Sequence, residues 1–270
     1  MGAQVEHECC VSERRTDVLG VEFNLVDYRA VTEEIAAWRN AGRREIVAIT
    51  NPHSVLLCAR DPTMGAATRN AGLVLPDGTG IILAARILGY QHNGRVTGPA
   101  LMLYLCDKGR ELGFRHYFYG GNEGVADQLA ERLSERFPGL QVGGTFCPPF
   151  RPITEEEDKE IVHRINATLP DIVWVGLGAP KQEKWMLAHH GRIAATAMIG
   201  IGAAFDFHSG NVRWAPRWIR KLGIEWAWRL ALNPRRMWRR NLDSPIFLCK
   251  VIAQRLRGAI AGLKAQRYEP

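Results

Sequence analysis

The stretch VLPDGTGIILAARILGYQHNGRVTG, residues 74–98, predicts the fold because it joins an apolar strand to a helix through a sharp turn. Asp77 stands between Pro76 and Gly78, where a strand cannot continue, so its carboxylate is expected at the carboxyl end of the strand. Open α/β sheets gather their ligands at that edge. Spacing alone fits catalysis by Asp77 and capping of a helix near Thr79 equally well, and the two roles are compatible.

Similar turns follow other apolar segments. The expected strand 45–50 ends in Thr50-Asn51-Pro52, where Thr50 or Asn51 can cap a helix whose first turn holds Pro52. Further strands are expected at 116–119, 141–146, 171–175 and 196–201. Because several glycine-bearing turns each follow a strand, we predict an α/β fold: a Rossmann-like, mostly parallel sheet with helices on both faces and one ligand edge.

The basic charge of the chain is concentrated at its C-terminal end. The whole chain carries +7, but residues 205–270 hold 14 Lys and Arg against four acids, a net +10, so the remainder carries −3. Five of the eight tryptophans lie in the same segment. A basic, aromatic segment is typical of binding to nucleic acid or to an anionic membrane surface.

These features predict three parts: a disordered leader over residues 1–16, a catalytic domain over 17–208, and a basic helical appendage over 209–270. The appendage is expected to form short helices broken at Pro216, Gly223 and Pro234, followed by a basic amphipathic helix over 247–263. No secretory signal and no transmembrane helix is predicted, since the longest apolar run, 193–205, is too short to span a bilayer. We therefore expect a cytoplasmic protein.

Several kinds of site are disfavoured. The turn at 176–183 keeps only two glycines of the dinucleotide fingerprint, with Lys181 at the third position, so no nicotinamide cofactor is expected. No two aspartates lie two residues apart, and the six cysteines form no C-x-x-C pair. We expect no metal and no other cofactor, and reduced thiols.

Taken together, the strand-end motifs resemble the TagA/WecG/CpsF glycosyltransferases over about residues 17–241. The motifs that carry the resemblance are Thr50-Asn51-Pro52, Leu75-Pro76-Asp77-Gly78, Arg95-Val96-Thr97-Gly98, Gly176 to Glu183, Gly202 to Asp206, and the basic stretch from Trp226 to Arg239. The resemblance implies transfer of a hexose from a UDP-sugar donor to a polyprenyl-diphosphate-linked sugar acceptor, on the cytoplasmic face of the bacterial membrane.

The resemblance also implies roles for individual residues. Asp77 would be the general base of an inverting single displacement, taking the proton from the acceptor hydroxyl. The implied substrate contacts are Thr50 and Asn51 at the sugar pocket, Arg95 and Gln182 at the donor diphosphate or sugar, Ile201 and Asp206 at the nucleoside, and Arg229, Arg236 and Arg239 at the diphosphate.

The donor sugar, the polymer made and the oligomeric state stay open, with N-acetylmannosamine, its uronic acid and glucose as candidate sugars. His53 stands where an acid is expected in many relatives, so the pocket beside the donor sugar is expected to differ. A nucleic-acid-binding protein is the alternative reading of the basic segment, but it leaves the strand-end motifs unexplained. An NAD-dependent oxidoreductase and a non-catalytic membrane scaffold explain fewer motifs still.

Overall fold

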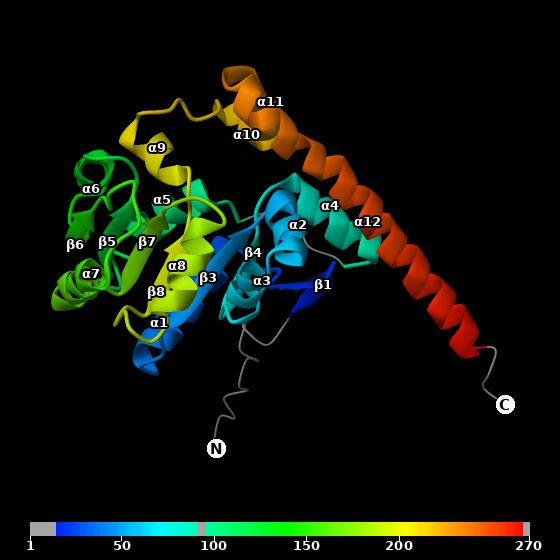
Figure 1. The fold of residues 1–270 in the computed structure, drawn as a ribbon, viewed down its shortest axis with the longest axis horizontal. Coiled ribbons are helices and arrows are strands. Elements are labelled where there is room, and N and C mark those ends of the chain that lie inside the picture. The colour runs from blue at the N-terminus through cyan, green and yellow to red at the C-terminus, as the bar shows by residue number, and fades with distance from the viewer. Residues whose placement is uncertain (1–14, 91–95, 267–270) are drawn as a thin grey trace, which may run out of the picture.

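The computed structural model describes residues 15–90 and 96–266, without the side chains of residues 221, 229, 236, 237, 239–241 and 261–266. A six-stranded, wholly parallel sheet in the order β4-β3-β8-β7-β5-β6 forms the centre (Figure 1). Its strands are β3 (Glu45–Thr50), β4 (Leu73–Pro76), β5 (Arg115–Gly120), β6 (Gln141–Phe146), β7 (Ile172–Gly176) and β8 (Ala197–Gly200).

Helices cover both faces of this sheet, which confirms the predicted fold class. One face carries α1 (Tyr28–Asn40), α5 (Gly98–Lys108), α6 (Val125–Arg136) and α9 (Ala204–Ser209). The other face carries α2 (Pro52–Arg60), α3 (Pro62–Arg69), α4 (Thr79–Leu88), α7 (Glu155–Ala167) and α8 (Lys181–His189).

The strands alternate their side chains between two apolar cores. In β3, Val47 and Ile49 join the core under α1 and α5, whereas Ile46 and Ala48 join the core under α2 and α4. Successive side chains of a strand point to opposite faces, so a strand buried on both faces is apolar throughout. This explains why β3 shows a continuous apolar run rather than an alternating pattern.

The direction of the connections changes in the middle of the sheet. The chain leaves β5 for its outer neighbour β6, but it leaves β7 for β8 on the other side. Gly120 and Gly176 meet where these two strands end, and a Cβ added to Gly120 would lie only 2.6 Å from the Gly176 backbone. A crevice of this kind, outside the carboxyl ends of the strands, is where doubly wound sheets bind ligands.

A short hairpin of β1 (Thr16–Val18) and β2 (Val21–Phe23) precedes the sheet. Residues 1–14 of the predicted leader lie outside the described residues, and Thr16 is already paired in β1. The domain boundary at residue 208 stays a prediction, and α9 runs across it.

The appendage contains α10 (Arg217–Leu222), α11 (Glu225–Leu232) and α12 (Pro234–Gln266). The predicted breaks at Pro216 and Gly223 fall outside the helices, and Pro234 is the first residue of α12. The last helix is longer than predicted, because it begins at Pro234 and continues through Pro245. Proline is tolerated in a first helical turn, and beyond Pro245 the buried Phe247 and Val251 hold α12 against the domain.

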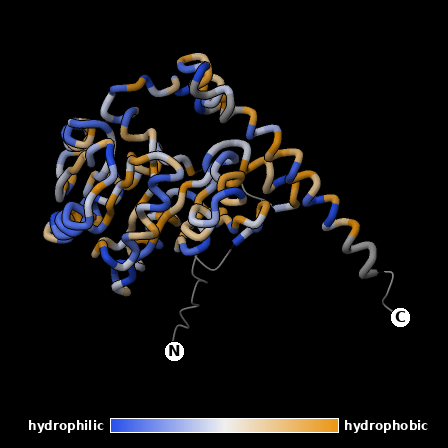
Figure 2. The backbone as a smooth tube through the Cα atoms, viewed as in Figure 1, coloured by the Kyte–Doolittle hydropathy of each residue, from blue (hydrophilic) through white to orange (hydrophobic). Residues whose placement is uncertain are grey.

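Hydrophobic and hydrophilic residues alternate along the coloured part of α12 in Figure 2. Among the described residues, no helix combines the length and the apolar character that crossing a bilayer requires.

Candidate active site

Asp77 lies in the turn after β4, at the carboxyl edge of the sheet. Its backbone N–H donates to the carbonyl of Thr50 at the end of neighbouring β3, over 3.0 Å, and Thr50 is 2% exposed. The N-cap of α4 is Gly78 with φ of 88°, a backbone conformation that favours glycine. The N-cap position of α4 is therefore Gly78 rather than Asp77, and the catalytic role of Asp77 stays a prediction.

Asn51 combines a structural role with its place at the same edge. It is the N-cap of α2, and its Oδ1 accepts the backbone N–H of Ser54 over 3.1 Å. Pro52 occupies the first turn of α2, as the sequence predicts. Because Oδ1 is used for capping, the amide hydrogens are the part of Asn51 that can serve a ligand.

The other two strand ends bring further predicted residues to the edge. Gln182 lies in the first turn of α8, after β7, and is only 5% exposed. Ile201 follows β8, donates its N–H to the carbonyl of Val175 over 3.0 Å and is 7% exposed. Asp206 is half-buried in the first turn of α9. This helix follows β8, which lies two strands away from β4, the strand that precedes Asp77.

The predicted arginines are described less fully. Arg95 lies outside the described residues. Arg229 belongs to α11, and Arg236 and Arg239 belong to the first two turns of α12, but their side chains fall outside the described part of the structure. Their proposed contacts with substrate stay predictions.

The appendage packs directly against the turn that holds Asp77. Thr79 Oγ1 donates to the carbonyl of Gly223, between α10 and α11, over 3.3 Å. Gly223 has a φ of 73°, and a Cβ added there would lie 2.1 Å from Thr79 Cγ2, so this contact requires glycine. A second tie joins His53 in the first turn of α2 to Asp243 of α12, with 2.5 Å between Nδ1 and Oδ2. Both ties place the appendage beside the ligand edge.

The tie between His53 and Asp243 was not predicted, because nothing in the sequence links residues so far apart. Glu183 was also missed as a separate candidate. It is 4% exposed and accepts a hydrogen bond from Gln182. Its position inside the turn motif, beside a predicted substrate contact, was the available signal.

His208 links α9 to α5 at the same end of the molecule. Its Nε2 donates to the carbonyl of Pro99 over 2.8 Å, and the ring of Trp214 packs edge-on at 5.0 Å. Burial lowers the pKa of His208 to about 4, so the imidazole is neutral at physiological pH. We assign His208 a structural role, because its ring is held between Pro99 and Trp214.

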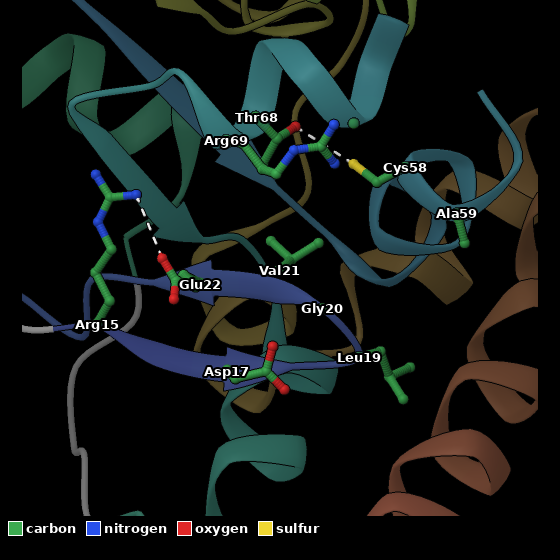
Figure 3. Close-up of a pocket in the computed structure, with 11 residues that line it drawn as sticks. Arg15, Asp17, Leu19, Gly20, Val21, Glu22, Cys58, Ala59, Thr68 and Arg69 are labelled. Atoms are coloured by element: carbon green, nitrogen blue, oxygen red, sulfur yellow. Dashed lines mark hydrogen bonds and ion pairs between the residues drawn. The ribbon is translucent and has the colours of Figure 1, made fainter. Parts of the chain in front are cut away.

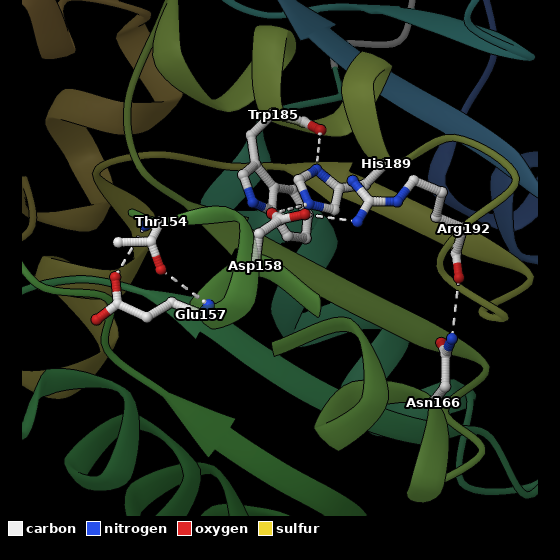
Figure 4. Close-up of polar contacts among 7 residues, drawn as sticks. All are labelled: Thr154, Glu157, Asp158, Asn166, Trp185, His189 and Arg192. Carbon is white, nitrogen blue, oxygen red and sulfur yellow. Dashed lines mark hydrogen bonds and ion pairs between the residues drawn. The ribbon is translucent and has the colours of Figure 1, made fainter. Parts of the chain in front are cut away.

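A polar cluster between α7 and α8 has a structural role as well (Figure 4). The carboxylate of Asp158 contacts His189 Nε2 at 2.7 Å and Arg192 at 2.5 Å, and the ring of Trp185 stacks on His189. Burial raises the pKa of Asp158, but the hydrogen bonds from Arg192 and His189 outweigh it and lower the pKa overall. The cluster holds α7 against α8.

A cavity of about 580 Å³ lies between the hairpin and helices α2 and α3 (Figure 3). Arg15 on its wall donates to the carbonyls of Ala71 and Gly72. These two residues immediately precede β4, which is an edge strand of the sheet. This cavity is therefore at the end of β4 opposite Asp77, away from the ligand edge. Within the described ranges, no cluster of three or more His, Cys, Asp or Glu residues is arranged to hold a metal ion.

Comparison with known proteins agrees with this geometry. The model of the glycosyl transferase WecG/TagA/CpsF family matches residues 16–261. The chain is 31% identical over 232 residues to an N-acetylglucosaminyldiphosphoundecaprenol N-acetyl-beta-D-mannosaminyltransferase of Bacillus spizizenii, covering 86% of this chain and 87% of the relative. An enzyme of the same name from Bacillus subtilis is 28% identical, covering 77% of this chain and 79% of the relative. Another from Staphylococcus aureus is 29% identical, covering 88% of this chain and 92% of the relative.

The matched region contains the whole sheet, both ties to the appendage and every predicted site residue. The nucleic-acid alternative is therefore set aside in favour of an enzyme: the chain belongs to the WecG/TagA/CpsF family of glycosyltransferases.

Proposed function

We propose that the protein transfers N-acetylmannosamine from its UDP-sugar to a polyprenyl-diphosphate-linked N-acetylglucosamine in the synthesis of a cell-envelope polymer. The names of the relatives give this sugar and this class of acceptor for those proteins, and the alignments span most of both chains. The observation that carries the proposal is the position of Asp77, one hydrogen bond from Thr50 at the ligand edge and next to the turn on which the appendage packs.

The proposed reaction is a single displacement with inversion at the anomeric carbon. An acceptor hydroxyl oxygen forms the new bond to this carbon while the bond to the UDP oxygen breaks, and Asp77 takes the hydroxyl proton. A carboxylate suits this step, since the hydroxyl becomes acidic only as it attacks. The charge left on UDP is neutralised by Arg95, Arg229, Arg236 and Arg239, because a guanidinium fork matches phosphate oxygens.

The remaining contacts follow the strand ends. Thr50 and Asn51 border the donor sugar, Gln182 meets the donor, and Ile201 and Asp206 border the nucleoside. His53 lies beside this pocket but is engaged by Asp243. His53 therefore contributes to the pocket wall as the hydrogen-bonded partner of Asp243, where many relatives are expected to have an acidic residue.

We also propose that the appendage docks the enzyme on the anionic inner face of the membrane, where a lipid-linked acceptor resides. Several large apolar side chains of α10 to α12 are exposed to solvent. Among them, the exposed fraction is 52–61% for Trp218, Trp226, Leu242 and Leu256. Each basic residue near an anionic surface adds about 1 kcal/mol, and apolar side chains add burial in the interface.

The transfer is tested by incubating the protein with UDP-N-acetylmannosamine, its uronic acid derivative or UDP-glucose and a short-chain polyprenyl-diphosphate N-acetylglucosamine, with product identified by mass. We expect product from UDP-N-acetylmannosamine and an anomeric configuration opposite to that of the donor. Product from another of these sugars would correct the sugar alone. Absence of product from all UDP-sugars would refute the proposed reaction.

Docking is tested by sedimentation with liposomes. Replacing Lys250, Arg255 and Arg257 with Gln should weaken binding to anionic liposomes and leave turnover of the short-chain acceptor unchanged. Lys159→Gln, an exposed change on α7, is the control. Equal binding of the unmodified protein to neutral and anionic liposomes would contradict electrostatic docking.

A further inference from the structure

Gln182 and Glu183 form a buried polar pair in the first turn of α8. Their exposures are 5% and 4%, and Gln182 Nε2 donates to Glu183 Oε1 over 2.9 Å. Amide and carboxyl side chains are seldom fully buried without a specific partner. Two consecutive buried polar residues at a ligand edge therefore call for a functional explanation.

The hydrogen bond fixes which way the amide of Gln182 faces. Because the NH₂ group of Gln182 donates to Glu183, the carbonyl oxygen of the same amide faces away from Glu183. Within the described part of the chain, this buried Oε1 has no hydrogen-bond partner. A buried acceptor left unsatisfied is costly, so a bound donor group would relieve it.

Glycines leave the amide close to the edge. A Cβ added to Gly200, at the end of β8, would lie 2.9 Å from Gln182 Nε2. A Cβ added to Gly202 would lie 3.4 Å from Gln182 Oε1 and 3.6 Å from the Cα of Gly178. The loop after β8 therefore passes close to Oε1 with backbone alone, since Gly202 has no side chain to cover this atom.

We propose that Glu183 is a positioning residue that turns the amide of Gln182 so that its Oε1 accepts a hydrogen bond from the donor sugar. This inference rests on the proposed function and deepens it. The bound group is an O–H or N–H of the sugar, since the diphosphate of a UDP-sugar offers only acceptors at neutral pH. Of the two contacts left open for Gln182, sugar and diphosphate, the geometry points to the sugar.

The test compares Glu183→Gln with the unmodified protein. A glutamine has the same shape but can donate as well as accept, so the amide of Gln182 is no longer held in one orientation. We expect KM for UDP-N-acetylmannosamine to rise about 3- to 10-fold, the effect of one neutral hydrogen bond, with kcat changed less. The affinity for UDP, measured by calorimetry, should stay within twofold of that of the unmodified protein.

Two further variants separate positioning from a general loss of fold. The double variant Gln182→Ala with Glu183→Gln should have the same KM as Gln182→Ala alone, because Glu183 acts only through Gln182. Glu160→Gln, an exposed change on α7, should alter nothing.

An active unmodified enzyme whose KM is unaffected by Glu183→Gln would overturn this inference alone, as would an equal loss of affinity for UDP. Independent effects of the two substitutions would also overturn it. An unmodified protein that neither binds nor uses any UDP-sugar would overturn the proposed function and this inference with it.

Discussion

The hydrogen bond between His53 and Asp243 should hold the C-terminal helix beside the active site. The two side chains are 26% and 12% exposed, their closest atoms are 2.5 Å apart, and Arg60 lies 3.9 Å from the other oxygen of Asp243. We predict that Asp243→Asn and His53→Asn each loosen α12 without unfolding the sheet.

The size of the effect follows from the geometry. Hydrogen bonds to charged groups contribute about 1.5–3 kcal/mol, and the partial exposure of His53 places this pair near the lower end. Since 1.4 kcal/mol is about tenfold in an equilibrium constant, local opening of α12 should become about 10-fold more frequent in either variant. Phe247 and Val251 stay buried against the domain, so full release is not expected.

Hydrogen exchange of the backbone amides in residues 243–255 measures this opening directly. The double variant should exchange at nearly the rate of either single variant, because both remove the same interaction. Transfer activity should fall together with protection, since α12 carries Arg236 and Arg239. Unchanged exchange in both single variants, or fully additive effects, would refute the reasoning.

Three other predictions concern stability and metal dependence. Burial lowers the pKa of His116 to about 3. Below about pH 6.5, His116 therefore binds a proton in the unfolded chain but not in the folded chain. Stability should fall as the pH drops from 6.5 toward 3. His116→Gln, which keeps an acceptor for Trp174, should flatten that part of the unfolding free-energy curve, and identical curves would contradict this. Because the pKa of Asp158 is lowered, Asp158→Asn should destabilise the protein by about 1–3 kcal/mol at pH 7. The difference in stability should vanish as the pH falls through the pKa of Asp158. A difference that persists in acid would exclude the contacts with His189 and Arg192 as its cause. Transfer should survive excess EDTA, because we propose arginines in place of a metal ion, and loss of turnover restored by magnesium or manganese would be the contrary result.

Strong local signals made much of the sheet predictable. Strands 45–50 and 141–146 have the predicted bounds, because turn residues flank each of them on both sides. The order of the strands was not predictable, since it depends on contacts between segments far apart in the chain.

The misjudged elements depend on tertiary contacts or on weak local signals. The last helix was expected over 247–263, but α12 begins at Pro234 and continues through Pro245, because it packs against α2 and α4. Helix α3 was not predicted, although Asp61 before Pro62 is a capping signal and Asp61 does accept the N–H of Met64.

The same distinction applies to the site. Strand ends placed Thr50, Asn51, Asp77, Gln182 and Ile201 at one edge because every strand of the sheet is parallel. The partners of those residues needed three-dimensional structure, since His53 and Asp243 are 190 positions apart. Phe247 and Val251 belong to the core of the domain, so point substitutions test the appendage better than its removal would.

Turnover of the Asp77→Asn variant tests the central claim most directly. The amide cannot accept the acceptor proton, so we expect turnover of UDP-N-acetylmannosamine to fall ~100- to 10,000-fold while the affinity for UDP is retained. Asp107→Asn, which removes a surface carboxylate near the far end of α5, should retain full activity. Near-normal turnover by Asp77→Asn, with the same product, would contradict the assignment of Asp77 as the general base.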